Sequence, residues 1–277
     1  MQKTLTTIAK TPIIGSTALL AYRASICGGY WARYTMQLIK WLFKSKETTN
    51  FTYHLQEGNK RYLAAMIDDI VNVGFDTVME YIAEIEQDAE LRQHISAATA
   101  RSNRSFTSDR DAKFGRRIGW YAIARAVKPK TIVETGVDKG LGACVLVAAL
   151  RKNKMEGYDG RYFGTDINRD AGFLLAGEYA NFGCILYGDS IKSLKALDER
   201  IDLFINDSDH SADYEANEYL AVEPKLSEHA ILLGDNAHCT TKLLEFSQAT
   251  GRRFAYFQEA PRDHWYPGAG IGFSFKR

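Results

Sequence analysis

Residues 131–142 read TIVETGVDKGLG, and this segment says most about the fold. Its first five residues form a short apolar run that is typical of a buried strand. Gly136, Gly140 and Gly142 follow, and glycine permits a tight turn and close approach of the backbone to a ligand. The spacing is neither the dinucleotide-binding pattern nor a P-loop. Helical sequence begins at Ala143, so we expect a strand, a glycine-rich turn and a helix.

The same alternation of strand and helix continues along the chain. We predict strands at 131–135, 162–165, 184–187, 201–205 and 230–233, and helices at 117–127, 143–150, 171–180, 191–197, 214–226 and 242–249. Short apolar strands that alternate with helices predict an α/β fold with a doubly wound, mostly parallel sheet. The runs at 254–258 and 271–275 have no helix between them, which predicts a C-terminal antiparallel strand pair.

Length and composition exclude several classes of protein. The chain has 277 residues, 45% of them hydrophobic, which indicates one large domain or one domain with an appendage, and enough apolar residues for a substantial core. With 35 basic and 34 acidic residues, it lacks the basic excess of a nucleic-acid-binding protein. Its four cysteines form no CxxC pair, which argues against a zinc ribbon or a redox pair and favours a reducing cytoplasm. We expect Cys144 and Cys184, which lie in apolar runs, to be buried.

The carboxyl ends of parallel strands bind ligands in folds of this type. Glu134 and the glycine-rich turn follow the first strand, Asp166 and Ile167 the second, and Asp189 and Ser190 the third. A carboxylate after the second strand can accept hydrogen bonds from both hydroxyls of a ribose. The alternative for Asp166 alone is a helix N-cap.

These strand ends, taken in order, resemble the class I S-adenosylmethionine-dependent methyltransferases, and the resemblance covers residues 116–277. It implies S-adenosylmethionine as cofactor and a Rossmann-like methyltransferase fold. The methionine end would lie on Glu134 and the turn that contains Gly136, Val137 and Gly140. By the same resemblance Asp166 and Ile167 would contact the ribose, and Asp189 and Ser190 the adenine, with Asp207 also near the cofactor.

The ends of the fourth and fifth strands carry Asp207 and His210, and then Asp235 and Asn236. Oxygen ligands from Asp207, Asp235 and Asn236 suit a hard divalent cation such as Mg²⁺. The arrangement resembles catechol O-methyltransferase, and more closely the macrocin and mycinamicin sugar O-methyltransferases and the cephalosporin-hydroxylase-like group. In the sugar enzymes a histidine three residues after the first metal aspartate is the base, which implies this role for His210. The sugar enzymes have an acidic pair where this chain has Asp235-Asn236.

Other interpretations of these residues stay open at this point. Asp207 and Asp209 could cap the following helix, and His210 could be a surface or supporting histidine. A zinc site built from His210, His238 and carboxylates is a further alternative. For the acceptor we expect contacts from Tyr53 and His238, and from His264, Trp265 and Tyr266 in the loop between the last two strands. That loop could equally be a well-packed hairpin.

The N-terminal part differs in composition from the rest. Residues 1–46 contain seven basic residues and no aspartate or glutamate, together with many aromatic side chains. Charges interrupt every apolar run before it reaches the roughly 20 residues needed to span a bilayer, and the match to a signal peptide is poor. We expect an arm that packs locally or in a homo-oligomer, or one that lies on an anionic membrane.

The remaining boundaries follow from periodicity. We predict a cap or lid of two helices within residues 47–110, a polar connection at 96–110, and the methyltransferase domain at 111–277. Three functions stay open: a metal-dependent O-methyltransferase that acts on a hydroxyl of a sugar, glycan or natural product, a metal-independent methyltransferase with another acceptor, and a catalytically silent cofactor-binding or membrane-associated protein.

Overall fold

The computed structural model describes residues 14–48 and 51–276. Two compact units can be distinguished in it. The larger one comprises residues 46–262 and the chain from Pro267 on, and the smaller one comprises the chain up to Ser45 together with Asp263–Tyr266. Among the described residues, no helix combines the length and the apolar character that a membrane crossing requires.

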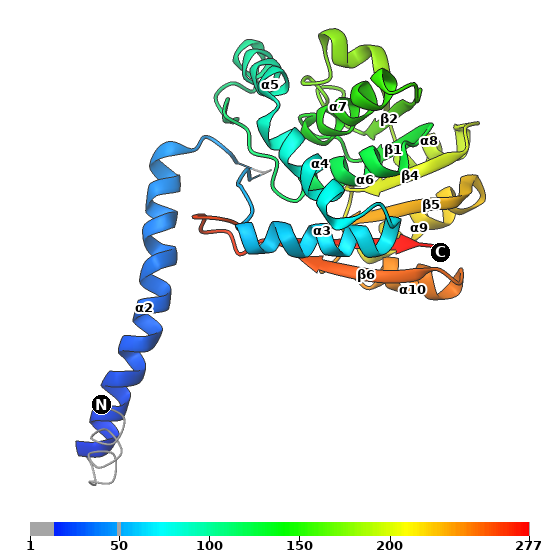
Figure 1. Ribbon diagram of the computed structural model, residues 1–277. Helices are drawn as coiled ribbons and strands as arrows, with labels where there is room; N and C mark the ends of the chain where they lie inside the picture. The colour runs from blue at the N-terminus through cyan, green and yellow to red at the C-terminus, as the bar shows by residue number, and fades with distance from the viewer. Residues whose placement is uncertain (1–13, 49–50, 277) are drawn as a thin grey trace. The chain divides into compact units, whose positions relative to one another are not determined.

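A seven-stranded sheet organises the larger unit (Figure 1). The strands are arranged β3-β2-β1-β4-β5-β7-β6, and β3, β2, β1, β4 and β5 are parallel. β7 lies antiparallel between β5 and β6. The bounds are β1 (Thr131–Thr135), β2 (Arg161–Asp166), β3 (Gly183–Tyr187), β4 (Ile201–Asn206), β5 (Leu226–Asp235), β6 (Arg253–Gln258) and β7 (Gly270–Phe275).

Helices cover both faces of the sheet. On one face α6 (Arg117–Val127) packs on α7 (Leu141–Met155), and α3 (Glu57–Val71), α4 (Phe75–Gln87) and α5 (Ala89–Arg101) pack outside them. On the other face lie α8 (Ser190–Ala196), α9 (Ala212–Val222) and α10 (Lys242–Ala249). Short 3₁₀ helices precede β3 and β5, at η1 (Gly177–Phe182) and η2 (Glu223–Lys225).

The core follows from the apolar strands. Alternate residues of a strand point to opposite faces, so both faces of β1 and β4 are buried beneath helices. On the side of α8, α9 and α10, Phe204 of β4 packs edge-on against Tyr219 of α9, which stacks on Phe246 of α10 at 5.4 Å between ring centroids. This packing fixes the strand ends that carry the site.

The predicted sheet, its mostly parallel direction and its antiparallel end are confirmed. The helix predicted at 171–180 is wrong, because Gly172 and Gly177 adopt positive φ angles and break the chain into turns before η1. The connection predicted at 96–110 is helical up to Arg101, since Asp88 caps a third helix by accepting from the Leu91 N–H group. Cys144 is buried as predicted, but Cys184 is exposed.

The smaller unit consists mainly of one long helix, α2 (Ile14–Lys44). Near its C-terminal end Trp41 makes edge-on contacts with Trp265 and His264, at 5.3 and 6.3 Å between ring centroids. Lys3 and Lys10, which contribute to the predicted basic arm, lie outside the described residues.

Candidate active site

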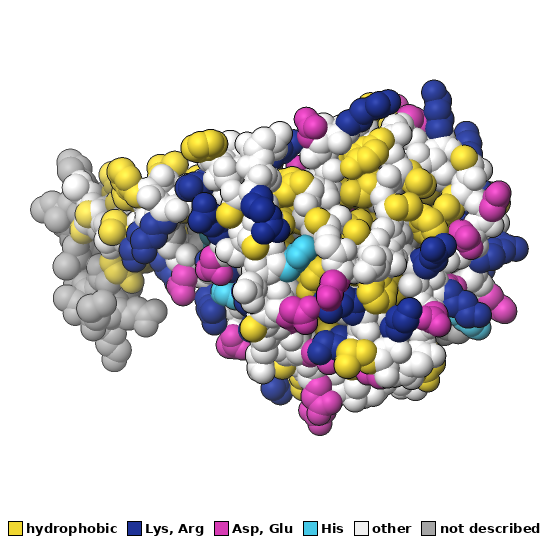
Figure 2. Space-filling model, turned by 90° about the horizontal axis from the view of Figure 1, so that it is seen from above, with side chains coloured by type: hydrophobic (Ala, Val, Ile, Leu, Met, Phe, Trp, Pro, Cys, Tyr) yellow, Lys and Arg dark blue, Asp and Glu magenta, His cyan; other side chains and the backbone are white. Residues whose placement is uncertain are grey.

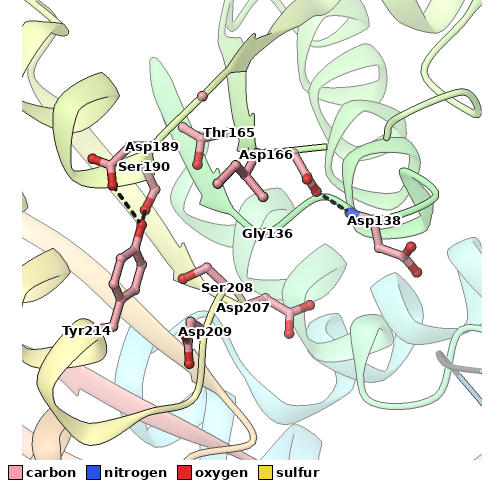
Figure 3. A pocket seen from close by; sticks show the side chains of 12 residues that line it. Gly136, Asp138, Thr165, Asp166, Asp189, Ser190, Asp207, Ser208, Asp209 and Tyr214 are labelled. Atoms are coloured by element: carbon pink, nitrogen blue, oxygen red, sulfur yellow. Dashed lines mark hydrogen bonds between the residues drawn. The ribbon is translucent and has the colours of Figure 1, made fainter. Parts of the chain in front are cut away.

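A cavity of about 450 Å³ opens at the carboxyl ends of β1, β2, β3 and β4 (Figure 3). This volume is in the range of small-molecule sites. The lining includes six of the residues predicted to bind the cofactor: Gly136, Asp166, Ile167, Asp189, Ser190 and Asp207. It also includes residues that were not predicted: Asp138, Thr165, Gly188, Ser208, Asp209 and Tyr214.

Gly136 lies where the carboxyl ends of β1, β2 and β4 meet. Its N–H donates to the Thr165 carbonyl at 2.9 Å, and its φ is +80°. A Cβ at this position would overlap the Asp207 carbonyl, so only glycine fits without displacing the backbone. The turn therefore brings β1, β2 and β4 together at the cavity.

Asp166 holds the turn from the opposite side. Its carboxylate accepts from the N–H groups of Asp138 at 2.9 Å and Asn168 at 2.8 Å. Figure 3 shows the first of these bonds at the cavity wall. No helix begins at Asp166, so the N-cap interpretation is wrong. Each carboxylate oxygen retains further lone pairs, which leaves Asp166 able to accept from ribose hydroxyls.

The side of the cavity that is predicted to bind adenine is built around a tyrosine that the sequence interpretation missed. Asp189 caps α8 by accepting from the Lys192 N–H at 2.8 Å. Tyr214 donates its hydroxyl to Asp189 at 3.4 Å, and this hydroxyl lies 2.8 Å from Ser190 Oγ (Figure 3). Tyr214 therefore closes this end of the cavity.

The sequence interpretation also missed Glu218 of α9, which lies below the cavity floor. Its buried carboxylate accepts from Thr135 at 3.2 Å and Ser208 at 2.7 Å, and from Ser190 and Asn206. Tyr214 and Glu218 are four residues apart and so share one face of α9, a signal that the sequence did contain.

Three predicted cofactor residues, Glu134, Val137 and Gly140, are not among the described residues that line the cavity. Glu134 is 1% exposed and accepts from the Tyr162 hydroxyl at 2.6 Å. Burial raises the pKa of Glu134 to about 8. A contact of Glu134 with the methionine end of the cofactor stays a prediction.

The raised pKa of Glu134 predicts a pH dependence of stability. A carboxyl group that is neutral in the folded state stabilises the fold below its unfolded pKa of 4.5, and this contribution is lost as the pH rises through about 8. Glu134→Gln keeps the shape of the side chain without its charge. In this variant the decrease in the free energy of unfolding with rising pH should be smaller by a few kcal/mol, because one pKa unit corresponds to about 1.4 kcal/mol. Urea unfolding of both proteins at pH 5 to 8 measures this. Parallel curves for the two proteins would contradict it.

A second cluster lies at the ends of β4 and β5. Ligand atoms of Asp207, His210 and Asp235 all lie within 4.8 Å of one another. His210 Nε2 is 3.8 Å from Asp207 Oδ1 and 3.0 Å from Asn236 Nδ2. Asn236 turns the chain after β5 with φ +53°, a conformation that asparagine tolerates well. The structure thus brings the predicted base and the three predicted metal ligands together.

Two arginines at the start of α6 join this cluster. Arg116 is buried, donates two N–H groups to the two oxygens of Asp235, and also donates to Glu259 at 3.2 Å. Arg117 Nη2 lies 3.7 Å from Asp207. Burial and the nearby Asp235 raise the pKa of Asp207 well above its ordinary value. Burial opposes ionisation of Asp235 as well, but Arg116 brings its pKa down to about 2.

The donor set fits a divalent cation, with one restriction. Asp207 offers a carboxylate, Asn236 an amide oxygen and His210 an imidazole, and oxygen donors suit Mg²⁺. Both oxygens of Asp235 already accept hydrogen bonds from Arg116. If Asp235 binds the cation, its negative charge is therefore shared between the cation and the guanidinium. Asp209 instead accepts from the Ser211 N–H at 2.8 Å and orders the turn before α9.

The predicted acceptor residues lie in different surroundings. Tyr53 is 3% exposed and donates its hydroxyl to Glu259 at 2.8 Å, so it supports the Arg116 network and does not line the cavity. His238 is exposed and outside the cluster of Asp207, His210 and Asp235, which leaves the zinc interpretation without its second histidine. His264, Trp265 and Tyr266 belong to the smaller unit, and their contact with an acceptor stays a prediction.

Comparison with known proteins agrees with the geometry. Residues 133–237 match the family model of a methyltransferase domain. No curated protein sequence matches the chain significantly. The match includes the glycine-rich turn, Asp166, Asp189 and the acidic cluster.

Several solved structures are similar to this chain. The O-methyltransferase TomG from Streptomyces achromogenes, involved in tomaymycin synthesis and solved with S-adenosylmethionine, is 17% identical with a TM-score of 0.52, over 68% of this chain and 90% of its own. The S-adenosylhomocysteine-bound methyltransferase PaMTH1 from Podospora anserina is 17% identical, with a TM-score of 0.47 over 82% and 100%. A protein described as a caffeoyl-CoA O-methyltransferase from Staphylococcus aureus is 14% identical, with a TM-score of 0.44 over 57% and 81%.

The sheet order, the cavity at the strand ends and the family match together define a class I methyltransferase domain. Residues 133–237 of the chain thus match a methyltransferase domain, and the larger unit shares its fold with an O-methyltransferase solved in complex with S-adenosylmethionine.

Proposed function

We propose that this protein transfers the methyl group of S-adenosylmethionine to a hydroxyl of a sugar, glycan or natural product, with a divalent cation, most simply Mg²⁺, at the acidic cluster. The observation that carries the proposal is the convergence of Asp207, His210 and Asp235 within 4.8 Å, with Asp207 also lining the cofactor cavity. A residue shared by both sites would bring the acceptor next to the cofactor.

The cofactor residues hold its parts in fixed places. Asp166 would accept from the ribose hydroxyls, and Asp189, Ser190 and Tyr214 would enclose the adenine. Gly136 leaves room for close approach of the backbone. When bound, S-adenosylmethionine supplies an electrophilic methyl group, whose bond to sulfur breaks as the bond to the acceptor oxygen forms, leaving S-adenosylhomocysteine.

His210 is the proposed general base. An alcohol with a pKa far above 7 is a poor nucleophile, and a nearby imidazole can remove its proton. His210 Nε2 would take this proton while Asp207, 3.8 Å away, stabilises the positive charge that forms on the ring. The acceptor hydroxyl would replace the Asn236 amide at this nitrogen. A divalent cation held by Asp207 and Asn236 would supply further acidification of the hydroxyl.

A second candidate is a metal-independent methyltransferase, and Arg116 is the specific observation that favours it. The bidentate pair between Arg116 and Asp235 already puts a buried positive charge beside the cluster, and Arg117 adds another 3.7 Å from Asp207. In this candidate the arginines would balance the carboxylates and His210 alone would activate the acceptor.

The test is a turnover assay with a panel of sugar, glycan and phenolic acceptors, with S-adenosylhomocysteine and the methylated product detected by mass spectrometry. Loss of activity on chelation with EDTA, restored by Mg²⁺, supports the metal-dependent proposal. Full activity after exhaustive chelation supports the second candidate. Cofactor binding with no turnover on any alcohol contradicts both and favours a catalytically silent protein.

Cofactor binding gives a separate prediction. Asp166→Ala should weaken S-adenosylmethionine binding by about 1.5–3 kcal/mol, because charge-assisted hydrogen bonds to the ribose are lost. Calorimetry measures the affinity, and NAD should not bind. Asp170→Ala, in the same loop, is the matched control, since Asp170 does not line the cavity. Unchanged affinity in Asp166→Ala would refute the assignment.

A further inference from the structure

The helix α2 concentrates the exposed apolar surface of the protein. Eleven of the eighteen large hydrophobic side chains that are exposed among the described residues lie on it. Trp31 is 71% exposed, Leu42 60% and Phe43 88%. Isolated exposed hydrophobic residues are normal on soluble proteins, but a contiguous surface of this kind marks an interaction site.

The charge of α2 has one sign. Arg23, Arg33, Lys40 and Lys44 lie on the helix, which contains no aspartate or glutamate. On the visible face of the larger unit, by contrast, Figure 2 shows acidic and basic side chains interspersed. A helix surface that is both apolar and purely basic is complementary to a surface in which negatively charged groups cover an apolar layer.

Over residues 31–44 the basic and apolar residues are separated around the helix axis, whereas Tyr22 and Ile26, about five turns before Lys40 and Lys44, lie on the basic face. Arg33, Lys40 and Lys44 recur at intervals of seven and four residues, which puts them on one face. Leu42 follows Arg33, and Lys40 follows Trp31, by nine residues, which is about two and a half turns, so the members of each pair point in opposite directions. The apolar region is also broad, since Met36 and Phe43 extend it beyond the stripe formed by Leu20, Trp31 and Leu42.

We propose that α2 binds the surface of an anionic lipid bilayer, with its apolar side in the acyl boundary and its basic side at the headgroups. Helices of this composition lie in the plane of the interface, where long basic side chains extend toward anionic headgroups. Pairing with a second copy fits less well, because one helix seam would leave much of the broad apolar surface exposed and would offer no acidic partner for the basic residues. The proposal is independent of the methyltransferase reaction.

The test is co-sedimentation of the full chain with vesicles of 30% phosphatidylglycerol in phosphatidylcholine, compared with phosphatidylcholine alone. We expect binding to the anionic vesicles that weakens with salt. The double variant Arg33→Glu/Lys40→Glu should bind at least about tenfold more weakly, given about 1 kcal/mol per basic residue at such a surface. Trp31→Ser should also weaken binding, through lost apolar contact.

The matched control is Lys192→Glu/Lys195→Glu, the same change of charge on exposed residues of α8, and it should bind like the unchanged protein. Circular dichroism and the melting temperature check that each variant folds. Failure of the unchanged protein to bind anionic vesicles overturns the proposal. So does a dimer in light scattering that the Trp31→Ser variant dissociates, because a second copy would then cover the helix. Equal loss of binding in the α8 control overturns it as well.

Discussion

Replacement of Asp207 with asparagine is expected to abolish turnover, with a loss of about 10³-fold or more, while S-adenosylmethionine still binds. The change keeps the shape of the side chain but replaces its carboxyl group, which lies 3.7 Å from Arg117 and 3.8 Å from His210, with an amide that is a much weaker ligand for a cation. Several kcal/mol of stabilisation at the acceptor oxygen depend on this group if it holds a cation, and each 1.36 kcal/mol is tenfold in rate.

The measurement combines a turnover assay with calorimetry of cofactor binding. Asp209→Asn is the matched control, because Asp209 lines the same cavity but accepts from the Ser211 N–H and stands outside the cluster. We expect this control to lose far less activity. If Asp207→Asn keeps its activity, or if it loses the cofactor and the acceptor reaction together, the proposed position of the acceptor is wrong.

Asp235 would give a less direct result, because its role in the fold cannot be separated from a role in the reaction. Its carboxylate is the partner of the buried Arg116, which also contacts Glu259 and through it Tyr53. Removing one member of a buried pair leaves the other charge unbalanced and costs about 3–5 kcal/mol of stability. An inactive Asp235→Ala variant is therefore informative only if its melting temperature is close to that of the unchanged protein.

The fold could be predicted from the sequence because its signals are local. Each parallel strand is a short apolar run, and the residues that end the strands must meet at one edge of the sheet. This is why Asp166, Asp189, Asp207 and Asp235 could be placed near the site from order alone. The local signals failed at Gly172, where the positive φ of one glycine ends a helix that the apolar pattern predicts.

The rest of the site depends on contacts between distant segments. Arg116 and Asp235 are 119 residues apart, and Tyr53 and Glu259 are 206 apart. Two arginines at the start of a helix look like solvated residues, since arginine is rarely buried without a partner. Nothing near Arg116 in the sequence reveals its partners, so the competition between guanidinium and cation at Asp235 was not predictable.

The proton acceptor is the remaining element of the proposed reaction, and His210→Gln should test it. The variant should lose about 10²–10⁴ in rate, the usual contribution of a positioned base. Asp207 Oδ1 and Asn236 Nδ2 both lie near Nε2 of the imidazole, at 3.8 and 3.0 Å, so this nitrogen faces the cluster. Because glutamine cannot accept the proton, we also expect the unchanged protein to lose rate at acidic pH and the variant to lack this dependence.

The control is His229→Gln, an exposed histidine on β5 outside the cluster, which should leave the rate and its pH profile unchanged. Affinity for S-adenosylmethionine should stay the same in both variants, since neither histidine lines the cofactor cavity. A His210→Gln variant that is nearly as active as the unchanged protein, together with an inactive Asp207→Asn, would show that the carboxylate and a cation activate the hydroxyl without the imidazole. A rate loss with an unaltered acidic limb would instead make His210 a positioning residue, which holds Asp207 and Asn236 in place without taking the proton.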